Sequence, residues 1–203
     1  MMRTVKRISV ALGSLATMTL LSNATYVATQ NVSANSLSGN SRVTFTGNTD
    51  PASSLKLTRV SNFDFGSSEL RSGTNTMTVL GDYSISVEDT RGGDQGYQVQ
   101  AKASEMKTAS AVVPGQSSGL TLPISSFKLT IGNGNTNSIG GSILGSQNSE
   151  IYTVANTIAT GDANSNGLNS TGLVSAAVDF ANTGVKALEY SGTIDYTLLD
   201  VKA

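Results

Sequence analysis

Apolar and polar residues alternate one by one along much of the chain from about residue 41 onward. A period of two predicts a β-strand that buries one face, because successive side chains of a strand point to opposite sides. Five segments show the pattern, each with apolar residues on one side and mainly Ser, Thr or charged residues on the other. The apolar positions are Val43 and Phe45; Ile85 and Val87; Phe127, Leu129 and Ile131; Val174, Ala176, Val178 and Phe180; and Ile194, Tyr196 and Leu198.

Stretches rich in Gly, Asn, Asp and Ser separate these segments, and such a composition is typical of turns. About ten short strands, each with one polar face, predict an all-β fold, namely an antiparallel, Greek-key-like β-sandwich that forms a single domain. No linker is long enough to divide the chain. Helix is expected to be minor, with at most a turn or two in residues 118–126 and 181–190.

The N-terminus has the features of a secretory signal peptide. The apolar stretch Ile8–Leu21 is too short for a typical membrane-spanning helix, and it follows three basic residues, Arg3, Lys6 and Arg7. The rest of the sequence shows neither a second apolar span nor an LPxTG sorting motif. We therefore expect a secreted, extracellular protein that has no transmembrane span and either diffuses away or holds the cell envelope through non-covalent contacts.

Small residues indicate where the signal peptide is cleaved. Ser22 and Ala24 occupy the two positions that signal peptidase reads, which predicts cleavage after Ala24; a less well spaced alternative ends at Ala34. Residues 1–24 would then be the signal peptide, residues 25–40 a flexible lead-in, and residues 41–203 the β-domain.

The composition excludes most catalytic chemistry, because the chain has no His, no Cys and no Trp. Without His or Cys there is no Ser-His-Asp or Cys-His pair, no zinc site of the usual kind and no redox dithiol. Carboxylate-only hydrolysis remains, but Glu88 and Asp89 are neighbours on a strand and point to opposite faces, which does not suit a glycosidase pair. We expect no enzyme activity and no cofactor, with a carboxylate-only hydrolase as a remote alternative.

The net charge argues against two classes of binding partner. The chain has 13 basic and 14 acidic residues, and loss of the three basic residues of the signal peptide leaves a net charge of about −4. A negative protein is a poor partner for nucleic acid or anionic lipid, so neither is expected.

Three stretches together resemble one known family of surface domains. They are SNFDFGSSEL (Ser61–Leu70), VEDTRGGDQGYQV (Val87–Val99) and EYSGTIDYTLLD (Glu189–Asp200). In their order and spacing they are similar to the WxL domain, a module of cell-surface proteins in low-GC Gram-positive bacteria. In that family the second stretch leads into a Trp-x-Leu motif, and the third carries another.

This chain has Tyr97-Gln98-Val99 and Tyr196-Thr197-Leu198 where the family has its two Trp-x-Leu motifs. Within each motif the ring and the residue two positions along point to the same face of a strand. One interpretation is that Tyr97, Val99, Tyr196 and Leu198 are core residues. The other, which the resemblance implies, is that one or both rings line a surface groove and stack on sugar or dock a partner.

The turn DTRGGDQG before Tyr97 also has two interpretations. Its glycines allow the positive φ of a tight corner, and Asp89, Arg91 and Asp94 can bond the backbone and one another across it. A lone Arg between two acids is more often a structural tie than a ligand site. Arg91 could instead bind a carboxylate of a wall peptide.

The loop DANSNG, Asp162–Gly167, matches the start of a calcium-binding loop. Its oxygen-bearing side chains are at Asp162, Asn164 and Asn166, but the twelfth position is Leu173 instead of a bidentate Glu. We expect a turn rich in Asn and Asp that holds no metal, with a weak calcium site as the alternative.

The sequence therefore predicts a secreted, non-catalytic protein that attaches non-covalently to the Gram-positive cell wall. The resemblance implies peptidoglycan or another wall polymer as the partner. It also implies assembly with other surface proteins, including membrane-anchored WxL-interacting proteins. The alternative is a structural or adhesive subunit that binds other proteins or host matrix through an exposed sheet edge, without affinity for glycan.

Overall fold

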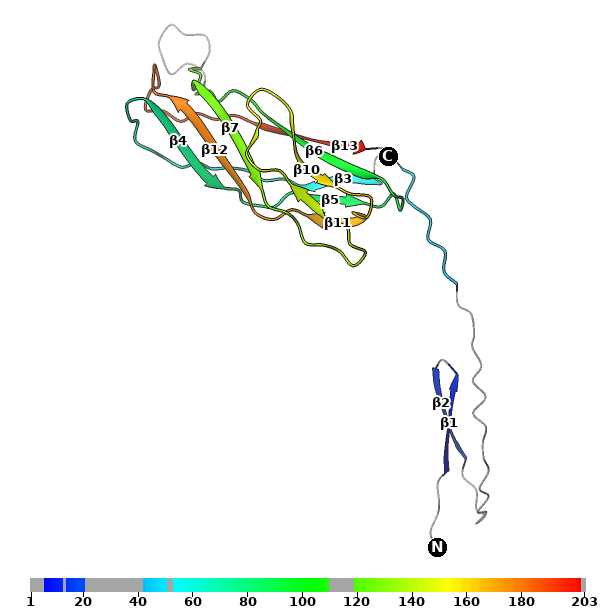
Figure 1. Cartoon of the computed structure of the whole chain (residues 1–203). Helices are drawn as coiled ribbons and strands as arrows, with labels where there is room; N and C mark the ends of the chain where they lie inside the picture. Colours follow the sequence, from blue (N-terminus) through cyan, green and yellow to red (C-terminus); the bar gives the residue numbers. More distant parts are fainter. Residues whose placement is uncertain (1–5, 13, 21–41, 51–52, 110–118, 202–203) are drawn as a thin grey trace. The chain divides into compact units, whose positions relative to one another are not determined.

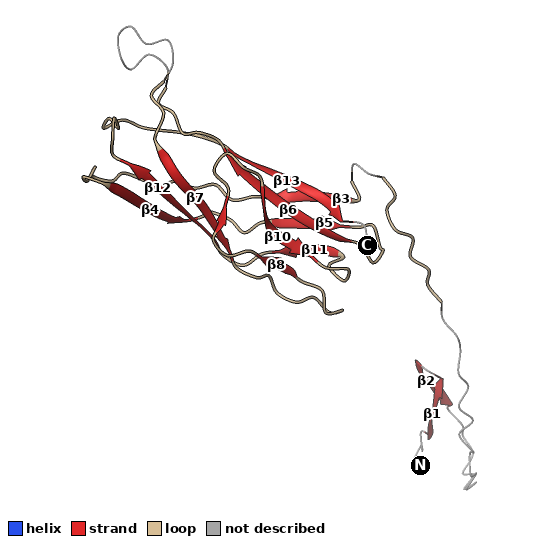
Figure 2. Ribbon diagram, turned by 45° about the horizontal axis from the view of Figure 1, so that its top comes forward, coloured by secondary structure: helices blue, strands red, loops and turns tan. Residues whose placement is uncertain are grey.

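The fold was analysed in a computed structural model, which describes residues 6–12, 14–20, 42–50, 53–109 and 119–201. The regular elements of these residues are all β-strands, and Figure 2 shows them joined by loops. No helix in the described ranges is long and apolar enough to cross a membrane. The chain forms two compact units, residues 1–45 and residues 46–203.

The N-terminal unit contains an antiparallel hairpin. It consists of β1 (Lys6–Leu12) and β2 (Ser14–Leu20), which lie within the predicted signal peptide. The expected cleavage after Ala24 and the lead-in at residues 25–40 fall outside the described residues, so both stay predictions.

The C-terminal unit is built from three sheets in which every strand pair is antiparallel (Figure 1). The first sheet has the order β13-β6-β10-β8, with bounds Ile194–Val201, Gly96–Ala103, Asn156–Gly161 and Ile143–Gly145. The second has the order β11-β5-β3, with bounds Gly167–Ser170, Ser86–Asp89 and Leu55–Arg59. The third has the order β4-β12-β7-β9, with bounds Thr74–Leu80, Val174–Ala181, Ile124–Ile131 and Ser149–Glu150.

One hydrophobic core is shared by these sheets, and it consists largely of the alternating positions that the sequence marks. Side chains from β5, β6, β7, β8, β10 and β12 belong to a single buried cluster. The predicted apolar residues of β12 and β7 are all buried: Val174, Ala176, Val178, Phe180, Phe127, Leu129 and Ile131. The predicted all-β, antiparallel sandwich class is confirmed, with three sheets around the core.

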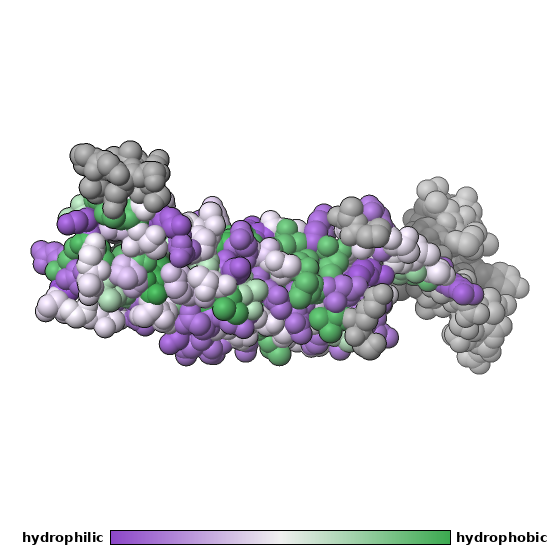
Figure 3. Space-filling model, turned by 90° about the horizontal axis from the view of Figure 1, so that it is seen from above, coloured by the Kyte–Doolittle hydropathy of each residue, from purple (hydrophilic) through white to green (hydrophobic). Residues whose placement is uncertain are grey.

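The outer faces of the strands carry polar residues between isolated apolar ones. Figure 3 shows hydrophobic and hydrophilic residues interspersed over one face of the molecule. Strand β13 follows the predicted alternation, because Ile194, Tyr196 and Leu198 are half-buried whereas Asp195 and Thr197 are exposed.

The strand expected at Val43 and Phe45 does not form. Residues 42–50 have no regular structure, and the two side chains are 73% and 87% exposed. A strand needs a neighbour to satisfy its backbone as well as an apolar side, and no described strand pairs with this segment. The prediction was wrong because two alternating residues reveal nothing about a partner.

The two segments expected to hold some helix contain none in their described parts. The first leads into β7, whose Ile124 pairs with Phe180 of β12. The second begins at the end of β12 and continues through a turn in which Gly184 has a φ of +78°. Strand pairing and this left-handed glycine both oppose a helix there.

Candidate functional site

Strand β6 places Tyr97 and Val99 on its inner face, where both are buried with exposures of 1% and 0%. Tyr97 lies opposite Gly161 of β10, and a Cβ at Gly161 would lie 2.3 Å from the ring carbon Cζ of Tyr97. Glycine therefore provides the room for the ring. Burial raises the pKa of the Tyr97 hydroxyl, which has no hydrogen-bond partner among the described residues. Neither side chain offers a surface to a ligand in this structure.

The Arg91 side chain is engaged on every side. Its Nε and Nη2 donate to the two carboxylate oxygens of Asp89, at 2.9 and 2.6 Å. Its Nη1 donates to Asp200 and to Gln95 Oε1, and Nη2 also donates to the carbonyl oxygens of Gln95 and Gly96. The hydrogen bond to Asp89 raises the pKa of the guanidinium. A carboxylate of a wall peptide would have to displace one of these partners, so the geometry indicates a structural role for Arg91.

Tyr196 and Leu198 differ from the first pair because β13 is an edge strand of its sheet, whereas β6 has a neighbour on both sides. Both side chains are half-buried. The Tyr196 hydroxyl donates to the carbonyl oxygen of Ser61 at 2.9 Å, and burial raises its pKa.

The three stretches that carry the family resemblance meet in space. Arg91 connects the second stretch to Asp200 in the third, and Tyr196 connects the third to Ser61 in the first. Strands β6 and β13 pair directly, with Leu198 opposite Val99. Segments that lie up to 135 residues apart thus form one continuous region.

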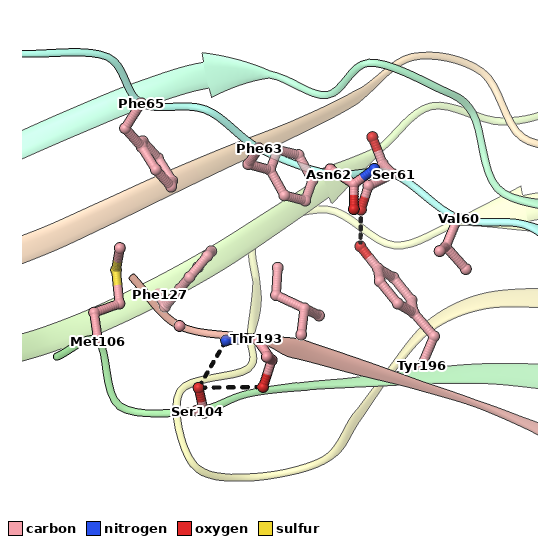
Figure 4. Close-up of a pocket in the computed structure, with 12 residues that line it drawn as sticks. Val60, Ser61, Asn62, Phe63, Phe65, Ser104, Met106, Phe127, Thr193 and Tyr196 are labelled. Carbon is pink, nitrogen blue, oxygen red and sulfur yellow. Dashed lines mark hydrogen bonds between the residues drawn. The ribbon is translucent and has the colours of Figure 1, made fainter. Parts of the chain in front are cut away.

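A pocket of about 300 Å³ opens where the first and third stretches approach each other, and we call it the aromatic pocket (Figure 4). Its lining comes from residues 60–65, from residues that follow β6, from Phe127 of β7, and from residues 192–196, which include the start of β13. The lining residues are Val60, Ser61, Asn62, Phe63, Phe65, Ser104, Met106, Phe127, Gly192, Thr193, Ile194 and Tyr196.

Aromatic rings form the walls of the aromatic pocket. Phe65 and Phe127 meet edge to face, with ring centroids 5.9 Å apart and planes at 75°. In Figure 4, Phe63 lies beside Phe65 on the same segment, and Tyr196 lies toward the other end of the pocket. Such rings offer flat apolar surfaces to a sugar or an apolar side chain.

Uncharged polar groups stand beside the rings. The backbone N–H of Thr193 donates to Ser104 Oγ at 2.8 Å. Asn62 is held through its backbone N–H and its Nδ2, which donate to the Asp82 carboxylate at 2.7 and 3.1 Å. The backbone bond from Asn62 lowers the pKa of Asp82. No lining residue carries a charge, so the aromatic pocket suits a neutral ligand with both apolar and hydrogen-bonding groups.

Of the five residues predicted to bind, only Tyr196 lines the aromatic pocket. Sequence reasoning quoted the stretch that holds Phe63 and Phe65 but assigned those rings no role. Ser104 and Thr193 had no detectable signal, because Ser and Thr are common in this sequence and only the fold brings these two together.

The Asp162 loop forms a turn held by its own hydrogen bonds. Asp162 Oδ1 accepts from the backbone N–H of Asn164 and from Ser165 Oγ, both at 2.9 Å. Within the described ranges no group of three or more acidic, His or Cys side chains could hold a metal. The loop geometry is that of a turn rich in Asn and Asp.

Comparison with protein families gives one match over most of the chain. The model of the WxL domain, described as a surface cell wall-binding domain, matches residues 37–201. Comparisons with curated proteins and with solved structures give no match. The matched range contains all three of the stretches that converge around β6 and β13. The chain therefore belongs to the WxL domain family, and it is a cell wall-binding protein of the cell surface.

Proposed function

We propose that the domain binds peptidoglycan non-covalently and without catalysis, and that the aromatic pocket receives the glycan. The observation that supports this most is the pocket's position, where two of the three family-like stretches meet. Its chemistry also agrees, because the glycan of peptidoglycan is a neutral polymer of N-acetylated sugars. Aromatic rings stack on the apolar faces of such sugars, and Ser, Thr and Asn groups bond their hydroxyl and amide groups.

The five predicted residues take different roles in this proposal. Tyr196 contacts the ligand from β13, and Leu198 supports the same face of that strand. Tyr97 and Val99 act indirectly, because they hold β6 in the core against β13. Arg91 fixes the end of β13 through Asp200.

Assembly with further surface proteins is part of the same proposal. Family membership supports it, and an open pocket of this size would bind a single wall unit only modestly. Several domains held together would gain affinity through multivalency.

Co-sedimentation with purified, protein-stripped cell walls tests the proposal. The wild-type domain is expected in the pellet, and Phe63→Ala is expected to weaken binding about fivefold, since one stacking ring contributes about 1 kcal/mol. Phe45→Ala is the matched control, because Phe45 is 87% exposed and lies outside the aromatic pocket.

Three results would count against the proposal. Wild-type protein that stays in the supernatant would favour the adhesive alternative. If Phe63→Ala is folded by circular dichroism and sediments like Phe45→Ala, the glycan binds outside the aromatic pocket. Release of soluble wall fragments during the incubation would instead point to hydrolysis.

A further inference from the structure

A second recess adjoins the aromatic pocket, and we call it the charged groove. Its volume is about 470 Å³, and Val60, Ile194 and Tyr196 line both recesses. In Figure 4, Val60 and Tyr196 lie at one end of the aromatic pocket, whereas Phe65 and Met106 lie at the other. A ligand that extends past the Tyr196 end of the aromatic pocket therefore reaches the charged groove.

The charged groove differs from the aromatic pocket because it is lined by one residue of each charge. Arg59 is the last residue of β3, and Asp195 is the second residue of β13. Both are exposed, and in the part of the chain that the structure describes no ion pair engages either of them. Lys102 lies opposite Asp195 on β6, yet the two form no ion pair. Both charges are therefore available to a ligand.

An aromatic ring positions the guanidinium of Arg59. Its Cζ lies over the ring of Tyr83, 5.4 Å from the centroid. Stacking on a ring face restricts the side chain and leaves its N–H groups able to donate to a carboxylate in the guanidinium plane. Arg91, in contrast, already binds two carboxylates of the protein. Arg59 is thus the better candidate for the carboxylate of a ligand.

Most of the remaining lining of the charged groove is apolar. Leu57, Val60 and Ile194 are half-buried, and Tyr196 adds its ring. Apolar surface combined with one cation and one anion suits a short zwitterionic peptide, because a neutral sugar would leave both charges unused.

We propose that the charged groove binds the stem peptide of the peptidoglycan unit whose sugars occupy the aromatic pocket. Peptidoglycan carries this peptide on the lactyl group of one of its sugars, so sugar and peptide reach adjoining sites together. An uncrosslinked stem ends in a carboxylate and bears the ammonium group of a diamino acid. Arg59 donates to the carboxylate, and Asp195 accepts from the ammonium group. This inference rests on the proposed function and adds the peptide to its ligand.

Isothermal titration calorimetry with soluble ligands that differ by one group tests the proposal. The full ligand is a peptidoglycan disaccharide-tetrapeptide whose only charges are the terminal carboxylate and a lysine ammonium group. Amidation of that carboxyl and acetylation of that amine should each weaken binding about threefold at low salt, because each removes one exposed ion pair. The disaccharide alone, with its lactyl carboxyl capped as a methylamide, lacks both ion pairs and should bind about tenfold more weakly than the full ligand.

Variants of the two charged residues link each effect to one side chain. Arg59→Gln should weaken binding of the full ligand about threefold and should no longer distinguish the amidated ligand from the full one. Asp195→Asn should behave in the same way toward the acetylated ligand. Lys56→Gln is the matched control, because Lys56 is an exposed cation of the same strand that pairs with Glu88 and lies outside the charged groove. If a variant does not fold, the ligand series with the wild-type protein decides alone.

Two outcomes would overturn the inference. The first is equal affinity of the wild-type protein for the full, amidated and acetylated ligands. The second is an equal loss in Arg59→Gln for the full ligand and for the capped disaccharide, which would mean that Arg59 acts on the sugar. The proposed function fails in a different way, namely when the capped disaccharide does not bind and the tetrapeptide alone binds as tightly as the full ligand.

Discussion

Tyr97 and Tyr196 occupy equivalent places in two motifs, yet their hydroxyls have opposite surroundings. The Tyr97 hydroxyl is buried and unpaired among the described residues, whereas the Tyr196 hydroxyl donates to Ser61 O. A buried polar group costs free energy when it lacks a partner and contributes stability when it has one. The same Tyr→Phe change should therefore act in opposite directions at the two positions.

We predict that Tyr97→Phe leaves the free energy of unfolding unchanged or raises it by about 1 kcal/mol, and that Tyr196→Phe lowers it by about 1 kcal/mol. Urea unfolding of the two variants checks this. Tyr97→Ala serves as a reference for loss of the whole ring, with an expected cost of about 3–5 kcal/mol. A clear loss of stability in Tyr97→Phe would mean that the Tyr97 hydroxyl has a partner.

Sequence alternation could place the two tyrosines on strands but could not distinguish core from groove. The pattern shows which side chains share a face, and it does not show what covers that face. The difference arises from strand order: β6 has neighbours on both sides, whereas β13 is an edge. For the same reason, the sequence identified the stretch that contains Phe63 but could not show that its ring lines a pocket.

At the scale of elements, Arg91 connects the turn after β5 to the last strand. Asp89 is almost fully buried, with its side chain 1% exposed, whereas the side chain of Asp200 is 42% exposed. A buried carboxylate that loses its cation is strongly destabilised, whereas an exposed ion pair contributes little.

We expect Arg91→Met to lower the free energy of unfolding by about 3–5 kcal/mol and Asp200→Asn to lower it by less than about 1 kcal/mol. Chemical denaturation of both variants at neutral pH measures the difference. Equal losses would show that the bond from Arg91 to Asp200, instead of the bond to Asp89, contributes most of the stabilisation.

Glu150 connects β9 to β7 in a similar way. Its burial raises the carboxyl pKa, but hydrogen bonds donated by Ser126 Oγ and by the backbone N–H groups of Phe127 and Tyr152 lower it below the ordinary value of 4.5, and the lowering prevails. A group with a lowered pKa stabilises the folded state above its unfolded pKa, and this contribution is lost as the pH falls.

We predict that stability is constant between about pH 5 and pH 9 and declines as the pH falls below about 4.5, and that Glu150→Gln makes the decline shallower. Some decline should remain, because the pKa of Asp82 is lowered too. Thermal unfolding at pH 6 and pH 3 provides the comparison. Identical declines in wild type and Glu150→Gln would show that protonation of Glu150 does not cause the loss of stability at low pH.

At the scale of the whole molecule, the family-like stretches are parts of one region. Their order and spacing could be read from the sequence, and so could the antiparallel class of the fold. The pairing of β6 with β13 and the approach of Ser61 to Tyr196 could not, because both join residues about 90 or more positions apart. Val43 and Phe45 show the same limit, since their alternation predicted a strand for which the described fold provides no partner.

Chemical-shift mapping of the folded domain with soluble, uncrosslinked peptidoglycan fragments shows directly whether the glycan binds at the aromatic pocket. We predict that the largest changes fall on the amides of Phe63, Ser104 and Thr193, with little change at Asn164 in the Asp162 loop. Changes centred on any other face, or none at millimolar ligand, would contradict a wall-binding site at the aromatic pocket.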